Sequence, residues 1–227
     1  MKGSKRKESL TMESTIQNGI TLLTDKSNQR EDTDCRARSE TAAKFYSWEF
    51  SCQSQALVDV PVALDRCELG YLDFAEGKVI GQKIAPITFI ANETIDFTDY
   101  LPNDFGLPLF SINLCHALDA FGIRTVQYFP VQILDSSHRL IRNDYFVANI
   151  TESTPCFDAE NSEYDIDAYR KLGMARRIQK LVIDSSIIGE RHLFRMAESW
   201  TVVIVSEELR SHLSASGVTG IEFAGMG

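Results

Sequence analysis

The hydrophobic pattern is densest between residues 107 and 150, where it predicts a short helix followed by two strands. Ser111 is a residue type that caps helices, and Leu114 and Leu118 follow at a spacing that places them on one face. Gly122 then supplies the left-handed residue that ends many helices. A helix this short needs a sheet to pack on, so we expect this stretch to form the centre of the fold.

The two strands after this helix are expected to pair. Residues 125–134 carry apolar side chains on both faces, which predicts a strand inside the sheet with cover on each side. Pro130 indicates a bulge or an unpaired flank there, because proline donates no ladder hydrogen bond. Residues 145–150 return as the next strand after a turn at residues 135–137, so a hairpin is expected.

The rest of the chain alternates short strands with loops. A period of two in KFYSWEF predicts a strand over residues 44–50. Ser206, followed by Glu207 and Glu208, predicts the start of a second helix that Gly217 ends, and with its neighbouring strands this helix could form a small β-α-β unit. Further strands are predicted at residues 79–80, 87–91, 180–184, 192–197, 201–205 and 220–224, with a short helix at residues 169–177.

Residues 1–42 differ from the rest of the chain in composition. They are rich in Ser, Thr, Lys, Arg and Glu and hold one apolar patch, at residues 20–23. Such a segment buries too little surface to offset the entropy of ordering it, so we expect a disordered tail. Residues 43–227 are expected to form a single α+β domain with a mixed or mainly antiparallel sheet and a few short helices.

Composition points to a cytoplasmic protein. No apolar run approaches the roughly 20 residues that cross a bilayer, and the basic amino end lacks the apolar stretch of a secretory signal. The five cysteines are odd in number and contain no CxxC pair. Free thiols in a reducing compartment fit this pattern better than a disulfide framework or a zinc site.

The charge is distributed unevenly. The net charge is −9, and because the first 44 residues carry nine basic and seven acidic side chains, the remainder carries −11. An acidic body repels nucleic acid and anionic lipid, so neither is expected as a partner. It would attract a basic protein, although acidic surfaces also serve solubility.

Three carboxylates, those of Asp96, Asp99 and Asp104, lie close together in the sequence. A metal or acid–base role is possible, but their spacing matches no calcium loop, and Asp beside Pro102 and Gly106 is typical of turns. The motifs GxGxxG, GxxxxGK[ST], HExxH and GxSxG are missing from the sequence. We therefore assign no catalytic, cofactor-binding or metal-binding residue.

A second acidic segment follows the hairpin, in CFDAENSEYDID. It holds Asp158, Glu160, Glu163, Asp165 and Asp167. Clustered acids repel one another at short range, so a cation or a basic partner would stabilise them. Two interpretations stay open: a solvated acidic loop, or a recognition surface for Lys and Arg on another protein.

An ordered series of segments resembles the bacterial immunity protein 11 family. It runs from LPLFSINLCHAL through GIRTVQYFPVQI and YFVANI to the Cys-x-Asp and Ser-x-Tyr of CFDAENSEY, and continues with KLVID, HLFRMAE, IVSEEL and GVTGIEF. The resemblance covers residues 97–223, a little over half of the chain. The first 42 residues have no counterpart in it.

The resemblance implies a cytoplasmic antidote that is encoded beside a toxin delivered by a contact-dependent or type VI-like secretion system. Such a protein binds its toxin in a stoichiometric complex and needs no catalytic residue or cofactor. If the toxin has a basic substrate groove, the acidic segment from Asp158 to Asp167 is the expected contact. The alternatives are a carboxylate-dependent enzyme of unrecognised type and an interaction domain whose partner is not a toxin.

Overall fold

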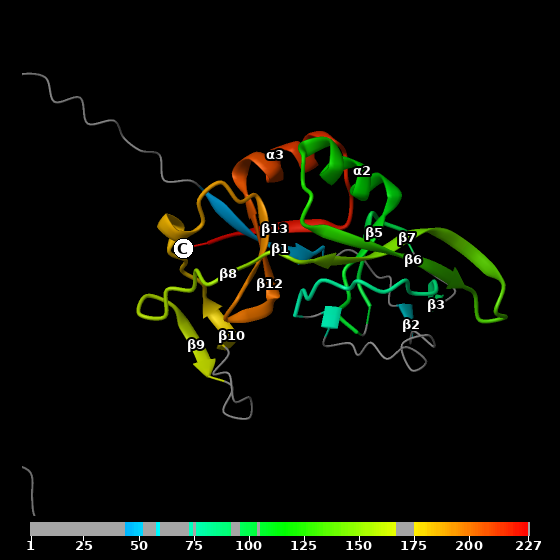
Figure 1. Cartoon of the computed structure of the whole chain (residues 1–227), viewed down its shortest axis with the longest axis horizontal. Coiled ribbons are helices and arrows are strands. Elements are labelled where there is room, and N and C mark those ends of the chain that lie inside the picture. Colours follow the sequence, from blue (N-terminus) through cyan, green and yellow to red (C-terminus); the bar gives the residue numbers. More distant parts are fainter. Residues whose placement is uncertain are drawn as a thin grey trace, which may run out of the picture. The chain divides into compact units, whose positions relative to one another are not determined.

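The computed structural model describes residues 44–51, 58–59, 73–74, 76–91, 96–103, 105–166 and 175–226. Within these ranges the chain forms two mixed sheets, one two-stranded sheet and two α-helices (Figure 1). This confirms the predicted α+β fold. The predicted disordered tail at residues 1–42 lies outside the described residues, and the single domain over residues 43–227 stays a prediction.

The two large sheets contain eleven of the thirteen strands found in the described ranges. The first has the order β13 (Ile221–Gly225), β1 (Phe45–Phe50), β12 (Ser199–Ser206), β11 (Leu193–Met196) and β8 (Ser153–Thr154). The second has the order β2 (Val58–Asp59), β3 (Ile87–Ala91), β6 (Val126–Leu134), β7 (Leu140–Ile150), β5 (Leu109–Ser111) and β4 (Tyr100–Leu101). The two-stranded sheet pairs β9 (Glu163–Ile166) with β10 (Ala175–Lys180). Neighbouring strands are antiparallel except for β11 with β8 and β3 with β6.

The two α-helices, α2 (Ile112–Phe121) and α3 (Glu207–Ala215), begin in the same way, as predicted. Each follows the last residue of a strand, Ser111 or Ser206, whose hydroxyl oxygen accepts a hydrogen bond from the backbone N–H three residues on at 3.2 Å. Each is followed by a glycine with positive φ, Gly122 or Gly217. Local capping therefore fixes both helices. The described residues also contain a 3₁₀ turn, η2 (Ser185–Ile187).

The two helices belong to matching units. Strands β5 and β6 are both antiparallel to β7, so β5-α2-β6 is a parallel crossover with β7 between its strands. Strands β12 and β13 are likewise both antiparallel to β1, so β12-α3-β13 repeats this arrangement and confirms the predicted β-α-β unit. The two cap serines, Ser111 and Ser206, lie 95 residues apart in the sequence. Ala117 of α2 and His212 of α3 have the same separation, so they occupy matching positions in the two helices. They are in contact, with His212 Nε2 3.0 Å from the Ala117 carbonyl oxygen.

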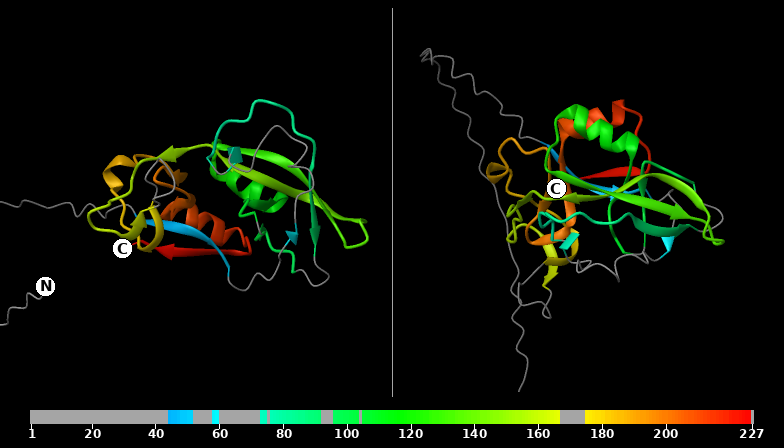
Figure 2. Two further views of the ribbon diagram at one scale, coloured as in Figure 1. Left: turned by 90° about the horizontal axis from the view of Figure 1, so that it is seen from below. Right: turned by 45° about the vertical axis from the view of Figure 1, so that its right-hand side comes forward.

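One apolar core joins the two units. Helices α2 and α3 lie side by side over one face of both large sheets (Figures 1 and 2), and the leucines that they bury meet the inner residues of those sheets. The core is made of Trp48, Tyr100, Phe110, Leu114, Cys115, Ala117, Leu118, Ile123, Ala148, Ile150, Leu193, Val203, Val205, Leu209 and Leu213. Two further clusters of buried residues include alternate side chains of the same strands, which point to the opposite faces of the sheets.

Strand β6 lies inside its sheet as predicted, between β3 and β7. Only one face of its second half, however, is covered by other residues. In its second half Phe129 and Val131 are buried whereas Pro130 and Gln132 are exposed, so the predicted cover on both faces is wrong there. Pro130 sits opposite Phe146, and pairing with β3 begins only at Val131. The flank beside Pro130 is thus outside the β3 ladder, which agrees with the predicted irregularity.

Three local predictions fail because pairing between distant segments decides the structure. Residues 79–80 are not a strand: the Ile80 backbone N–H and C=O bond to the side-chain amide of Gln127 instead. Residues 175–177 belong to β10 rather than to a helix, and the earlier part of that prediction, residues 169–174, lies outside the described residues. Residues 180–184 are not a strand either, because Lys180 ends β10 and Ile183 makes an isolated bridge with Phe157.

Two glycines allow a matched test of the contact between the large sheets. Gly220 and Gly217 both have positive φ, at +82° and +70°, but a Cβ on Gly220 would lie 2.6 Å from the Tyr100 carbonyl oxygen, whereas one on Gly217 would have no neighbour within 4 Å. We expect Gly217→Ala to cost about 1 kcal/mol of unfolding free energy, from backbone strain. Gly220→Ala should cost roughly 2 kcal/mol more, because β4 and β13 must move apart. Urea unfolding measures both; equal losses would contradict the close approach.

Candidate functional site

Asp99, one of the three candidate carboxylates, connects distant elements. Its carboxylate accepts hydrogen bonds from Ser111 Oγ at 2.5 Å and from the backbone N–H and side-chain hydroxyl of Thr219, both at 2.9 Å. Partial burial alone would raise the pKa of Asp99, but the hydrogen bonds from Ser111 and Thr219 outweigh it, and the pKa is lowered. Asp99 therefore holds the cap of α2 against the segment that enters β13.

The other two carboxylates do not join Asp99 in a site. The side chain of Asp96 is exposed, and Asp104 lies outside the described residues. Throughout the described ranges, His, Cys, Asp and Glu side chains form no group of three or more that could hold a metal ion. Asp99 thus has a structural role, but its carboxylate joins distant segments and does not close the local turn that the sequence suggested.

The two described cysteines are buried thiols. Burial raises the pKa of Cys115 to about 12 and that of Cys156 to about 11, so both stay protonated near neutral pH. A protonated thiol is a poor nucleophile and a poor metal ligand. These two cysteines are therefore core residues; the other three lie outside the described residues.

A serine–histidine contact also serves the fold. His192 Nδ1 lies 2.8 Å from Ser206 Oγ, a spacing that a nucleophilic serine would need. The Ser206 side chain is buried, however, and its oxygen accepts the Leu209 N–H as the cap of α3. The pair therefore extends a helix cap and presents no accessible nucleophile.

The acidic segment after the hairpin divides into a structural and an exposed part. The Asp158 carboxylate accepts the backbone N–H groups of Glu160 and Asn161, which closes a turn. Glu160, Glu163 and Asp165 are exposed.

The exposed acids face basic residues across the small sheet. On β10, Lys180 is in register with Glu163, and the Arg177 guanidinium lies 3.8 Å from the Asp165 carboxylate. Asp167 lies outside the described residues. Basic residues of β10 therefore offset part of the negative charge of the acidic segment. The surface there is less negative than the sequence of the segment alone suggests.

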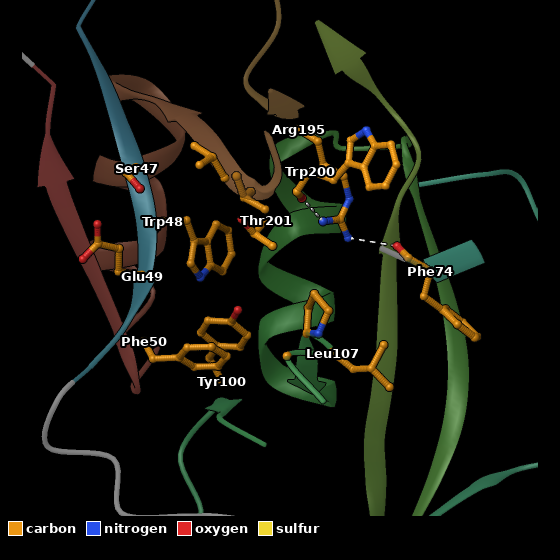
Figure 3. Close-up of a pocket in the computed structure, with 14 residues that line it drawn as sticks. Ser47, Trp48, Glu49, Phe50, Phe74, Tyr100, Leu107, Arg195, Trp200 and Thr201 are labelled. Carbon is orange, nitrogen blue, oxygen red and sulfur yellow. Dashed lines mark hydrogen bonds between the residues drawn. The ribbon is translucent and has the colours of Figure 1, made fainter. Parts of the chain in front are cut away.

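A cleft of about 500 Å³ opens between β1 and β12 (Figure 3). We call it the β1–β12 cleft. Five large aromatic residues line it, namely Trp48, Phe50, Phe74, Tyr100 and Trp200. Phe50 stacks on Tyr100 with ring centroids 4.2 Å apart, and Trp48 stacks on Phe110 at 5.4 Å. Stacked rings hold their neighbours in place, so these walls are preformed.

Arg195 forms one side of the β1–β12 cleft and is 4% exposed. Its guanidinium donates to the carbonyl oxygens of Trp200 at 2.7 Å and Phe74 at 3.3 Å (Figure 3). It also donates to the carbonyl oxygen of Ile150 at 3.1 Å. Because these carbonyls come from separate parts of the chain, Arg195 connects the two large sheets. A single arginine within the apolar HLFRMA segment is a sequence signal for such a role, and the sequence analysis passed over it.

The described structure is thus an α+β protein whose candidate catalytic groups take part in holding the fold together. The family comparison identifies it further: the model of the immunity protein family Imm11 matches residues 83–227, and the chain belongs to this family. This confirms the resemblance. No curated protein matches the sequence. Among the described residues, no helix combines the length and hydropathy that a membrane crossing requires.

Variants of Asp99 and Asp96 test whether the Asp99 carboxylate stabilises the fold. We expect Asp99→Asn to lower the unfolding free energy by about 1 to 2 kcal/mol at neutral pH, since charged hydrogen bonds are lost from a partly exposed site. A lowered folded-state pKa stabilises the protein above the unfolded pKa, so the difference from wild type should vanish as pH falls below about 4. Asp96→Asn, on an exposed side chain, is the control. A pH-independent loss would contradict the proposed role.

Proposed function

We propose that this chain is an antidote that binds a cognate bacterial toxin in a stoichiometric complex and so neutralises it. The observation that carries the proposal is the Imm11 family match over residues 83–227. Membership of an immunity protein family implies a toxin as partner. We further propose that the chain acts in the cytoplasm of the producing cell, against a toxin delivered by a contact-dependent or type VI-like secretion system.

Binding, rather than catalysis, is the mechanism that the described side chains support best. Asp99 is engaged by Ser111 and Thr219, Cys115 is buried with a raised pKa, and Ser206 caps a helix. A carboxylate-dependent enzyme would need such groups to face a substrate. An antidote needs only a rigid surface that is complementary to its toxin.

The acidic segment is the first proposed contact for a toxin with a basic active-site groove. The proposal covers Asp158, Glu160, Glu163, Asp165 and Asp167, and the strong net negative charge of the body supports it. Of these, Glu160 and Glu163 have exposed side chains, and neither forms an ion pair with another described residue. Exposed acids attract a basic surface over several ångströms, so they would mainly raise the rate of association.

Co-expression with the toxin domain encoded by the adjacent gene tests the proposal. We expect growth to be restored and the two chains to purify as one complex, because the antidote acts by occupying its toxin. Changing Glu160 and Glu163 to Lys should lower the association rate by roughly tenfold at low salt, with a smaller effect at high salt.

The matched control changes Asp96 and Glu190 to Lys, which shifts the net charge by the same amount at other exposed positions. If both double variants slow association equally, the segment is not the contact and only the overall charge matters. Restored growth without any complex between the two chains would instead refute neutralisation by binding.

A further inference from the structure

The β1–β12 cleft holds both tryptophans of the chain. Trp48 and Trp200 lie on opposite walls (Figure 3), and the sequence contains no other tryptophan. Tyr100 and Arg195 also line the cleft. Tryptophan, tyrosine and arginine are the residue types that most often dominate the binding energy of protein–protein interfaces, where they form well-packed pockets. The cleft therefore has the composition of an anchoring pocket in such an interface.

The hydroxyl of Tyr100 is a polar group in this cleft that the fold does not use. The residue is 8% exposed, and its hydroxyl makes no hydrogen bond with any described residue. Figure 3 shows its oxygen pointing into the cleft, toward Trp48. Burial raises the pKa of Tyr100, so the hydroxyl stays protonated and is able to donate. An occupant that supplies an acceptor would gain a hydrogen bond that the free protein leaves unmade.

Trp48 places a second unused donor beside this hydroxyl. The residue is 7% exposed, and its indole nitrogen Nε1 has no hydrogen-bond partner among the described residues. The rings of Trp48 and Tyr100 meet edge to face with their centroids 5.8 Å apart, so both donors lie at the same end of the cleft. Because Nε1 is itself buried, the Tyr100 hydroxyl is the first donor that an occupant meets.

The charge at this end of the cleft favours an oxygen atom. Figure 3 shows the Arg195 guanidinium across the cleft from Trp48. Its positive charge acts on the Tyr100 hydroxyl and opposes the larger effect of burial on the pKa of Tyr100. Two uncharged donors and a cation thus act on one region, and an oxygen with partial or full negative charge complements them.

We infer that the β1–β12 cleft receives one side chain of the toxin, which is flat and apolar along its body and carries an oxygen that accepts a hydrogen bond from the Tyr100 hydroxyl. The aromatic walls would enclose the body of this side chain. The volume of about 500 Å³ lies within the range of pockets that enclose small ligands, so a single large side chain fits. This inference rests on the proposed function and names a contact through which it operates.

A matched pair of tyrosine variants tests the hydrogen bond. Tyr100→Phe removes the hydroxyl and keeps the ring, so affinity for the toxin domain encoded by the adjacent gene should fall roughly threefold to tenfold. Its unfolding midpoint should not fall, because the hydroxyl makes no hydrogen bond in the free protein. Tyr128→Phe is the control, since that hydroxyl is also buried without a partner among the described residues but lies outside the cleft.

Calorimetric titration of the full chain and urea unfolding measure the two properties separately. Wild-type affinity in both tyrosine variants would overturn the inference. So would a Tyr100→Phe variant that loses unfolding stability and keeps its affinity, because its hydroxyl would then serve the fold.

The two tryptophans report directly on whether the cleft is occupied. Labelling the full chain with fluorotryptophan gives two fluorine NMR signals, from Trp48 and Trp200, and Trp200→Phe assigns them. Unlabelled toxin domain should shift both signals and saturate the change at one molar equivalent, because both rings line the cleft. A complex in which neither signal moves would overturn the inference and leave the proposed function intact.

A second pair of variants tests the same contact by steric block. Thr201 is exposed at the cleft, so Thr201→Trp should fill the cleft and weaken toxin binding by roughly tenfold or more, with little effect on the unfolding midpoint. Gln132→Trp, at an exposed position of β6 in the other sheet, should bind as wild type does. Equal binding by both variants would contradict an occupied cleft.

The remaining outcomes are distinguishable. Fluorine signals of the free chain that depend on its concentration mean that a second copy fills the cleft. Signals that change when the chain is unfolded, dialysed and refolded mean that a small molecule from the cell filled it. Either result overturns the inference. Failure of the toxin domain to bind at all overturns the proposed function as well.

Discussion

The fold depends on one shared apolar core beneath α2 and α3. Leu114 and Leu118 from one helix and Leu209 and Leu213 from the other are almost fully buried in it, against both large sheets. Neither helix is long enough to be stable alone, so each relies on the sheet beneath it and on the other helix. The two β-α-β units share one arrangement that meets this need for a supporting sheet: each packs its helix on three neighbouring strands.

Joining two sheets in this way uses the polar residues that would otherwise suggest chemistry. Asp99 holds the start of α2 against Thr219, and Arg195 collects carbonyl oxygens from both sheets. The same arrangement separates β1 from β12 beyond Ser47 and leaves the β1–β12 cleft. A rigid body of this kind is suited to holding another protein, which agrees with membership of an immunity protein family.

Features that local chemistry decides could be predicted from the sequence. The capping serines, the helix-ending glycines and strand β3 at Ile87–Ala91 all lie where the pattern places them. Features that depend on distant partners could not: residues 175–177 form a strand because β9 pairs with them, and that pairing also offsets the acids of β9. The β1–β12 cleft is the extreme case, because it arises where two strands more than a hundred residues apart stop pairing.

The central claim is that the chain neutralises a toxin by occupying it, and titration of the purified toxin with the purified chain tests this most directly. Toxin activity should fall linearly and reach zero near one molar equivalent, because each antidote molecule removes one toxin molecule. Complete loss of toxin activity at a small fraction of an equivalent would show turnover and contradict the account. So would full toxin activity in the presence of an excess of the chain.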